Sequence, residues 1–321
     1  MAANPKLKRA VTNALKEYIG LDEDERLLII ADENKRDIAM IMLESAKKIC
    51  GEVVYVEMPE AEHENQRMMG PIGEMMKGFD TVVSVATKSI YRTKARKEAS
   101  QLGIRVVSMP DISEGTITRC LSGKPDKLID ITALVARNFK GVQEIRVTSF
   151  LGTNIVMPVR KRRIMSYTGV LTNIGESGIV PSGVVHITPT EKRSDGIIVF
   201  DGSITGLGKL KAPVKVDIIK GRITKIDGKA EAKKLQKIFD AADEDATVLA
   251  KFGVGTNPKA TVCGVMVEDE HSLGSVHIAF GDNSHIGGKT SSESYIAGVI
   301  KKPTIYFDDI IIMDEGELVL E

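Results

Sequence analysis

The first 130 or so residues alternate between two spacings of apolar residues, and this alternation limits the fold more than any other feature of the chain. Short apolar runs rich in Val, Ile and Leu occur at residues 26–31, 52–56, 81–85 and 104–107, and segments of helical spacing, such as residues 37–49 and 94–101, lie between them. Strands that alternate with helices predict a parallel sheet covered on both faces. We therefore expect a doubly wound α/β domain over residues 1–140.

From about residue 140 the pattern changes to short strands separated by Gly, Pro, Asn and Asp. We expect strands at residues 144–148, 183–187, 196–200, 215–219 and 222–226. Lys220-Gly221 predicts the turn of a hairpin, and a single helix is expected over residues 230–241. The sequence thus predicts a second, β-rich α+β domain over residues 141–321.

Composition excludes several classes of partner. Lys+Arg and Asp+Glu both number 44, so no net charge attracts nucleic acid or an anionic membrane. No stretch approaches the roughly 18 apolar residues of a spanning helix, and the first residues lack the apolar core of a signal peptide. The three cysteines, Cys50, Cys120 and Cys263, are widely spaced, odd in number and without a Cys-x-x-Cys pair, which argues against a disulfide framework or a structural zinc site. We expect a cytoplasmic protein with neither a membrane nor a nucleic-acid partner.

Nucleotide-binding signatures are missing as well. No Gly-x-Gly-x-x-Gly follows a predicted strand of the first half, and no Gly-x-x-x-x-Gly-Lys-Ser/Thr occurs. These absences disfavour dinucleotide chemistry and P-loop nucleotide chemistry.

Four segments of the second half carry an ordered set of motifs. They are residues 181–191 (PSGVVHITPTE), 251–258 (KFGVGTNP), 276–283 (VHIAFGDN) and 292–300 (SESYIAGVI). The set resembles the metal-site motifs of the aminopeptidase T/aminopeptidase S family and of its iron-dependent relative, 2,5-dihydroxypyridine 5,6-dioxygenase. The resemblance extends over most of the chain and implies a homodimer.

The resemblance also implies where metal ligands would stand, and most of them are replaced. The two glutamates of the family fall on Val184 and Lys251, and its later His and Asp fall on Tyr295 and Ala297. The first His of the family persists as His277. Catalytic zinc sites use three protein ligands, and an ammonium repels a dication at short range. We expect that the inherited metal site does not form and that the protein has no metal cofactor.

Three functional interpretations follow. In the first, a divergent aminopeptidase T-like protein, hydrolase-type if active, acts on or binds a small amide or ring compound, or a short peptide, in the old active-site cleft. Lys251 and Tyr295 would then form an acid/base pair, with His277 as a proton shuttle that also orients the ligand.

The second interpretation is a metal-dependent aminopeptidase or hydrolase with a rebuilt centre at His186, His277 and His285, since Val184 and His186 lie two residues apart on one strand face. The third is a non-catalytic binding or assembly protein. Under the first interpretation, His186 and His285 would bind substrate.

A basic cluster and two more histidines are the remaining candidates. The cluster Arg160-Lys161-Arg162-Arg163 is typical of a solvated basic surface, and the functional alternative is capture of a carboxylate or phosphate, with Arg160 as a substrate-binding residue. His63 and His271 have acidic neighbours, so we expect both to be exposed.

Overall fold

The computed structural model describes residues 4–320 of the chain. They form two compact units, of which the first comprises residues 4–127 and 168–182 and the second comprises residues 128–167 and 183–320. The sequence predicted one boundary, near residue 140. In the structure the second unit begins within a helix, and residues 168–182 return to the first unit, so the boundary is crossed three times.

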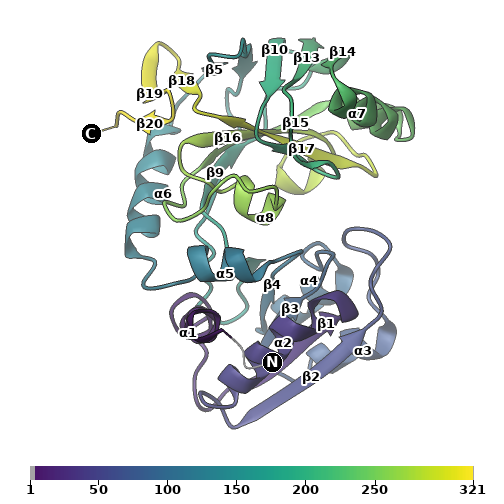
Figure 1. Cartoon of the computed structure of the whole chain (residues 1–321), viewed down its shortest axis with the longest axis vertical. Helices are drawn as coiled ribbons and strands as arrows, with labels where there is room; N and C mark the ends of the chain where they lie inside the picture. The colour runs from purple at the N-terminus through teal and green to yellow at the C-terminus, as the bar shows by residue number, and fades with distance from the viewer. Residues whose placement is uncertain (1–3, 321) are drawn as a thin grey trace. The chain divides into compact units, whose positions relative to one another are not determined.

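A parallel five-stranded sheet forms the first unit, which confirms the expected α/β class. Its strands in spatial order are β2 (Glu52–Met58), β1 (Arg26–Asp32), β3 (Thr81–Val85), β4 (Arg105–Ser108) and β8 (Ser177–Ile179). The helices and helical turns of the unit are α1 (Pro5–Asn13), η1 (Ala14–Tyr18), η2 (Glu33–Lys35), α2 (Arg36–Ala46), α3 (Gly70–Met76), α4 (Lys94–Gln101) and α5 (Glu114–Cys120), and most of them are labelled in Figure 1. Leu28, Ile30 and Val82 are fully buried, as the apolar runs of the sequence predict for strands covered on both faces.

Two antiparallel sheets form the second unit. The eight-stranded sheet contains, in order, β14 (Arg222–Gly228), β13 (Val214–Ile219), β10 (Asp195–Phe200), β6 (Asn154–Pro158), β5 (Glu144–Thr148), β18 (Thr304–Phe307), β19 (Ile310–Asp314) and β20 (Glu317–Leu318). The seven-stranded sheet contains β12 (Gly208–Lys209), β11 (Ser203–Ile204), β17 (Tyr295–Lys301), β16 (Ser275–Gly281), β15 (Leu249–Gly255), β9 (Val184–Ile187) and β7 (Ile164–Tyr167). Helical segments of this part are α6 (Asp126–Asn138), α7 (Ala230–Asp240), η3 (Glu244–Thr247), α8 (Met266–Asp269) and η4 (Ser284–Ile286).

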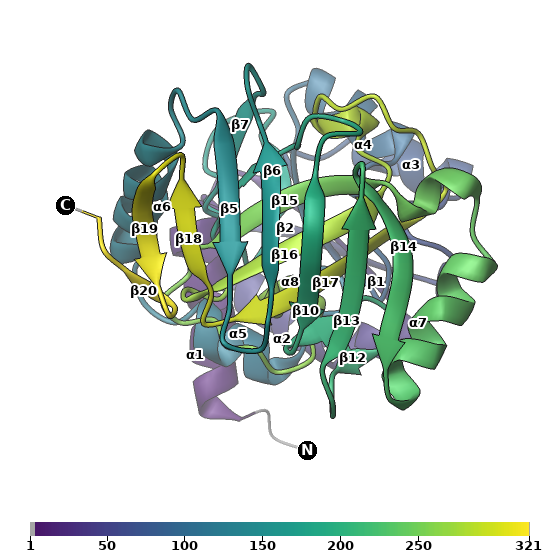
Figure 2. The same cartoon turned by 90° about the horizontal axis from the view of Figure 1, so that it is seen from above.

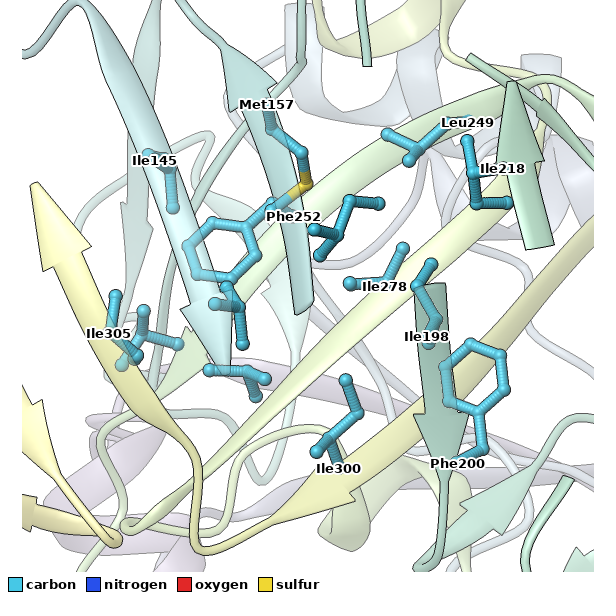
Figure 3. Close-up of a cluster of buried hydrophobic side chains, with 14 of the residues drawn as sticks. Ile145, Met157, Ile198, Phe200, Ile218, Leu249, Phe252, Ile278, Ile300 and Ile305 are labelled. Carbon is cyan, nitrogen blue, oxygen red and sulfur yellow. The ribbon is translucent and has the colours of Figure 1, made fainter. Parts of the chain in front are cut away.

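The core of the second unit lies between its two sheets. Figure 2 shows β5, β6, β10 and β13 crossing over β15, β16 and β17. Side chains from both sheets, among them Met157, Ile198, Phe252, Ile278 and Ile300, meet in this layer (Figure 3). Because successive residues of a strand point to opposite faces, packing one face of β15 and β16 into this core leaves the alternate residues on the other face.

No helix within residues 4–320 combines the length and the apolar character needed to cross a lipid bilayer.

Candidate functional site

Four residues singled out by the sequence share one face of the seven-stranded sheet, opposite the core. Gly253 on β15 is paired with His186 on β9 and with His277 on β16, so the two imidazoles flank one glycine. Lys251 lies two residues before Gly253 on β15. Tyr295 on β17 is paired with Gly281, and Gly281 lies four residues after His277 on β16. Residues at even spacing on paired strands share a face, and we call His186, Lys251, His277 and Tyr295 the polar face.

Gly253 is required for this arrangement because the ring of His277 lies directly over it. A Cβ at residue 253 would stand 2.2 Å from Cε1 and 2.4 Å from Nε2 of His277. Only glycine leaves room for the imidazole to lie across the neighbouring strand. The motif at residues 251–258 therefore has a structural purpose that does not depend on a bound metal.

Glu270 completes the site from a loop that follows α8. Its Oε2 lies 3.2 Å from Nζ of Lys251 and 3.6 Å from Nε2 of His277. The main-chain oxygen of Glu270 lies 3.1 Å from Nδ1 of His277. A carbonyl oxygen only accepts hydrogen bonds, so Nδ1 carries the proton and Nε2 keeps its lone pair when the ring is neutral.

Lys251 and Glu270 form an ion pair in surroundings that exclude most water. The Lys251 side chain is 11% exposed and that of Glu270 is 16% exposed. Burial alone lowers the pKa of Lys251, but Glu270 and Tyr295 outweigh it, and the pKa lies above its usual value. Burial is the largest single influence on Glu270 and raises its pKa, but the charge and hydrogen bond of Lys251, together with the nearby His277 and His271, outweigh burial and lower the pKa to about 2. Both groups are charged at neutral pH.

The two histidines of the polar face are neutral at that pH. Burial, followed by the charge of Lys251, lowers the pKa of His277 to about 3. The same two causes hold the pKa of His186 well below its usual value. His186 packs against Tyr167 with 5.5 Å between ring centroids. Neither of its ring nitrogens has a hydrogen-bond partner among the described residues.

Tyr295 is in contact with the ammonium of Lys251. The Nζ atom lies 5.1 Å from the centroid of the phenol ring, within the range of a cation–π interaction. Tyr295 is half-buried, whereas Lys251 and His277 are buried. The aromatic ring and Glu270 thus hold the ammonium from two sides.

Sequence reasoning missed Glu270 and misjudged its neighbour. His271 was expected to be exposed, but it is 8% exposed, and its Nδ1 lies 2.8 Å from the main-chain oxygen of Val267. His63 is exposed, as predicted. The run Glu268-Asp269-Glu270-His271 gives no local sign of burial, because acidic runs are usually solvated.

Two predicted substrate-binding residues lie outside the polar face. Arg160 is exposed on the turn between β6 and β7, and the neighbouring Arg162 is paired with Glu191. His285 lies on η4, where its Nδ1 is 2.8 Å from Oδ2 of Asp282. The structure therefore brings together His186 and His277 of the proposed histidine centre and places His285 on a separate turn.

The positions that the resemblance assigned to metal ligands do converge. Val184 is paired with Gly255, and Ala297 with Ala279, so both lie on the same sheet face as Lys251, His277 and Tyr295. Across residues 4–320, no three His, Cys, Asp or Glu side chains are arranged to hold a metal ion. The ammonium of Lys251 occupies one of these positions and is paired with the carboxylate of Glu270. The residues present therefore do not fit a divalent cation.

Comparison with known proteins identifies the family. The sequence model of 2,5-dihydroxypyridine 5,6-dioxygenase matches residues 6–320. The chain belongs to the 2,5-dihydroxypyridine 5,6-dioxygenase family. A curated member of this family from Pseudomonas putida KT2440 is 22% identical over 311 residues, which cover 86% of this chain and 85% of the relative.

The fold of the family is shared with the aminopeptidases that the sequence motifs resemble. A solved structure of 2,5-dihydroxypyridine dioxygenase from Pseudomonas putida KT2440 superposes with a TM-score of 0.82 and 20% identity, covering 99% of this chain and 98% of that one. Wild-type AmpT from Thermus thermophilus superposes with a TM-score of 0.67 and 15% identity, covering 98% of this chain and 99% of that one. The resemblance drawn from four motifs is thereby confirmed.

Proposed function

We propose that this member of the dihydroxypyridine dioxygenase family works without a metal and binds, or acts on, a small ring or amide compound at the polar face. The observation that carries the proposal is the Lys251–Glu270 ion pair, 3.2 Å long, on the sheet face where the family motifs converge. An ammonium at that position supplies a fixed positive charge. It replaces the electrostatic contribution of a metal but not its coordination or redox chemistry.

The expected chemistry is stabilisation of the partial negative charge on a ligand carbonyl or hydroxyl oxygen. An ammonium has three N–H donors, and Glu270 accepts from one of them. Because its pKa is raised, Lys251 stays charged and acts as an electrostatic stabiliser rather than as a general base. The Nε2 atom of His277 is buried and has no hydrogen-bond partner among the described residues, and Tyr295 provides an aromatic wall beside Lys251.

Binding without turnover is the second candidate. None of the four groups of the site with a resolved shift, Lys251, Glu270, His186 and His277, titrates near neutral pH, whereas general acid–base catalysts work best when their pKa is near the pH of the medium. The proposal includes a homodimer, as the resemblance implies. It also includes a cytoplasmic location, which the free thiols of Cys50, Cys120 and Cys263 favour.

Calorimetry under anaerobic conditions tests the proposal with 2,5-dihydroxypyridine, after which the relatives are named, and with nicotinamide as a ring amide. We expect chelator-treated protein to bind at least one probe, and the affinity to be unchanged by added iron(II) or zinc. The double substitution Lys251→Met with Glu270→Gln should weaken binding at least tenfold. Lys8→Met with Glu44→Gln removes an exposed ion pair of similar length and serves as the control.

Two results would contradict the proposal. One is stoichiometric metal that disappears in His277→Ala, which would favour the rebuilt metal centre. The other is probe binding that the double substitution at Lys251 and Glu270 leaves intact, which would remove the polar face from the binding site.

A further inference from the structure

Four turns of the second unit form an exposed basic surface that the polar face does not use. They are residues 159–163 between β6 and β7, 188–195 at the start of β10, 220–221 between β13 and β14, and 282–290 between β16 and β17. We call this surface the basic patch. Its exposed cations are Arg160, Lys161, Arg163, Lys192, Arg193, Lys220 and Lys289.

Hydrogen bonds hold the four turns next to one another. Arg162 pairs with Glu191, which joins the first turn to the second. The main-chain N–H of Lys289 donates to Oε1 of Glu191 (3.1 Å), which joins the fourth turn to the second. The main-chain N–H of Gly221 donates to the main-chain oxygen of Ser194 (2.7 Å), which joins the third turn to the second. The basic patch is therefore one continuous surface built on fixed turns.

Positive charge is concentrated in the basic patch, although the net charge of the whole chain is zero. Eight Lys and Arg side chains and three carboxylates give the four turns a net charge of +5. Arg162 is paired with Glu191, whereas the seven exposed cations have no ion-pair partner among residues 4–320. Close like charges repel one another, and a partner that brings negative charges relieves this repulsion.

Acidic residues on both sides limit the size of such a partner. Glu144 is paired with Pro158, just before the first turn, and its main-chain oxygen accepts from the N–H of Asp308 (2.9 Å). On the other side Arg222, which follows the third turn, is paired with Asp245. A long polyanion would extend over these carboxylates and be repelled. A short acidic segment can stay within the basic patch.

The dimensions and the composition of the turns favour a peptide. β6, β10 and β13 are neighbours in the eight-stranded sheet, so the ends of the outer two are about 10 Å apart. The long cationic side chains widen the surface, and an extended segment of about six to eight residues covers it. The four turns contain no Phe, Tyr or Trp on which the bases of a nucleic acid could stack.

We propose that the basic patch is a docking surface for a short acidic segment of a partner protein, whose Asp and Glu carboxylates pair with the exposed cations. Guanidinium and ammonium groups both pair well with carboxylates. The inference does not rest on the proposed function, because the polar face and its ligand take no part in it.

Fluorescence anisotropy on the full-length protein tests the inference with an acetylated, labelled octaglutamate. The neutral matched probe is octaglutamine, and the nucleic-acid probe is an oligothymidylate with the same number of negative charges. We expect octaglutamate to bind and its affinity to fall as salt is added, because these charges are exposed. Octaglutamine should not bind, and oligothymidylate should bind at least tenfold more weakly than octaglutamate.

Substitutions locate the binding surface. Replacing Arg160, Lys161 and Arg163 together by Ser should weaken octaglutamate binding at least tenfold. The control removes the same total charge elsewhere and should stay within twofold of wild type. It replaces three exposed lysines outside the basic patch by Ser, namely Lys47, Lys124 and Lys234.

Carbodiimide coupling locates the surface without any substitution. This reagent joins the carboxylates of bound octaglutamate to lysine amines in direct contact with them. We expect mass spectrometry of the wild-type protein to find the probe on the four lysines of the basic patch, Lys161, Lys192, Lys220 and Lys289.

Four results would overturn the inference. They are no binding of octaglutamate above that of octaglutamine, equal losses in the two triple variants, oligothymidylate binding as tight as that of octaglutamate, and coupling mainly to lysines outside the basic patch. The triple variant of the basic patch should still bind the ring compounds as the wild type does. Failure of the docking surface therefore leaves the proposed function standing, and failure of the ring compounds to bind leaves the docking surface standing.

Discussion

The Nζ atom of Lys251 lies 3.2 Å from Oε2 of Glu270, although one residue is on a central strand and the other follows a four-residue helix. The pair is enclosed on a face where alternate strand positions carry His186 and His277. A fully exposed ion pair contributes little to stability, but in a partly buried pair the loss of one charge leaves the other desolvated and unpaired. The contribution of the pair can therefore be measured from the stability of substituted proteins.

Lys251→Met should lower the free energy of unfolding by about 2–3 kcal/mol. The cost is below that of a fully buried pair because 16% of the Glu270 side chain is exposed. Adding Glu270→Gln to Lys251→Met should recover most of the loss, since no unpaired charge then remains. Urea titrations measure both changes. Lys8→Met, which breaks an exposed pair, should cost less than about 0.5 kcal/mol.

Stability should fall as the pH is lowered below about 6.5. The pKa of His277 drops from 6.5 to about 3 on folding, so the unfolded chain binds its proton first, and stability is lost between these values. The pKa of Glu270 drops from 4.5 to about 2, so its contribution is present above 4.5 and is lost on the way to 2. Unfolding titrations at several pH values measure the slope. His277→Asn should flatten it between pH 6 and 5, and an unchanged slope there would contradict the neutral state of His277.

The regular parts of the fold were predictable because their signals are local. The apolar run that forms β1 and the segment that forms α4 each show their periodicity within a few residues. The Lys220-Gly221 turn joins β13 and β14, as expected. β8 was not predicted, because three residues gain their strand conformation only by pairing with β4, about 70 positions earlier in the sequence. Such long-range pairing leaves no periodic trace.

Part of the candidate site was likewise predictable from the sequence, and part was not. The motifs identified Lys251, His277 and Tyr295, and strand alternation was enough to predict that His186 shares the face of Val184. Glu270 was missed because its burial depends on how the loop after α8 folds back onto β15 and β16. Whether a carboxylate is solvated or paired is decided by tertiary contacts, which a run of acidic residues does not reveal.

Gly253→Ala should displace the ring of His277 and destabilise the protein by about 1–3 kcal/mol. The added methyl would stand 2.2 Å from Cε1 of that ring, which has no free space on its own strand face. In a His277→Ala background the same substitution should cost much less, because the clashing ring is gone. Gly51→Ala is the control, since a Cβ there meets nothing within 4 Å. Equal costs of Gly253→Ala in the two backgrounds would show that the clash with His277 is not the cause.

Cys263 should react slowly with thiol reagents although it is only half-buried. Burial, with Asp269 and Glu268 adding to it, raises the pKa of its thiol to about 11, so at pH 8 on the order of one molecule in a thousand carries the reactive thiolate. Asp269 also fixes the loop, because its two carboxylate oxygens accept from the main-chain N–H groups of Cys263 (2.7 Å) and Gly264 (2.8 Å). Asp269→Asn keeps one acceptor and removes the charge, so labelling should become at least several-fold faster. The labelling rate is measured with Cys50 and Cys120 replaced by Ser, which leaves Cys263 as the single thiol. If the folded protein with Asp269 intact reacts as fast as the urea-unfolded chain, the expected protection is refuted.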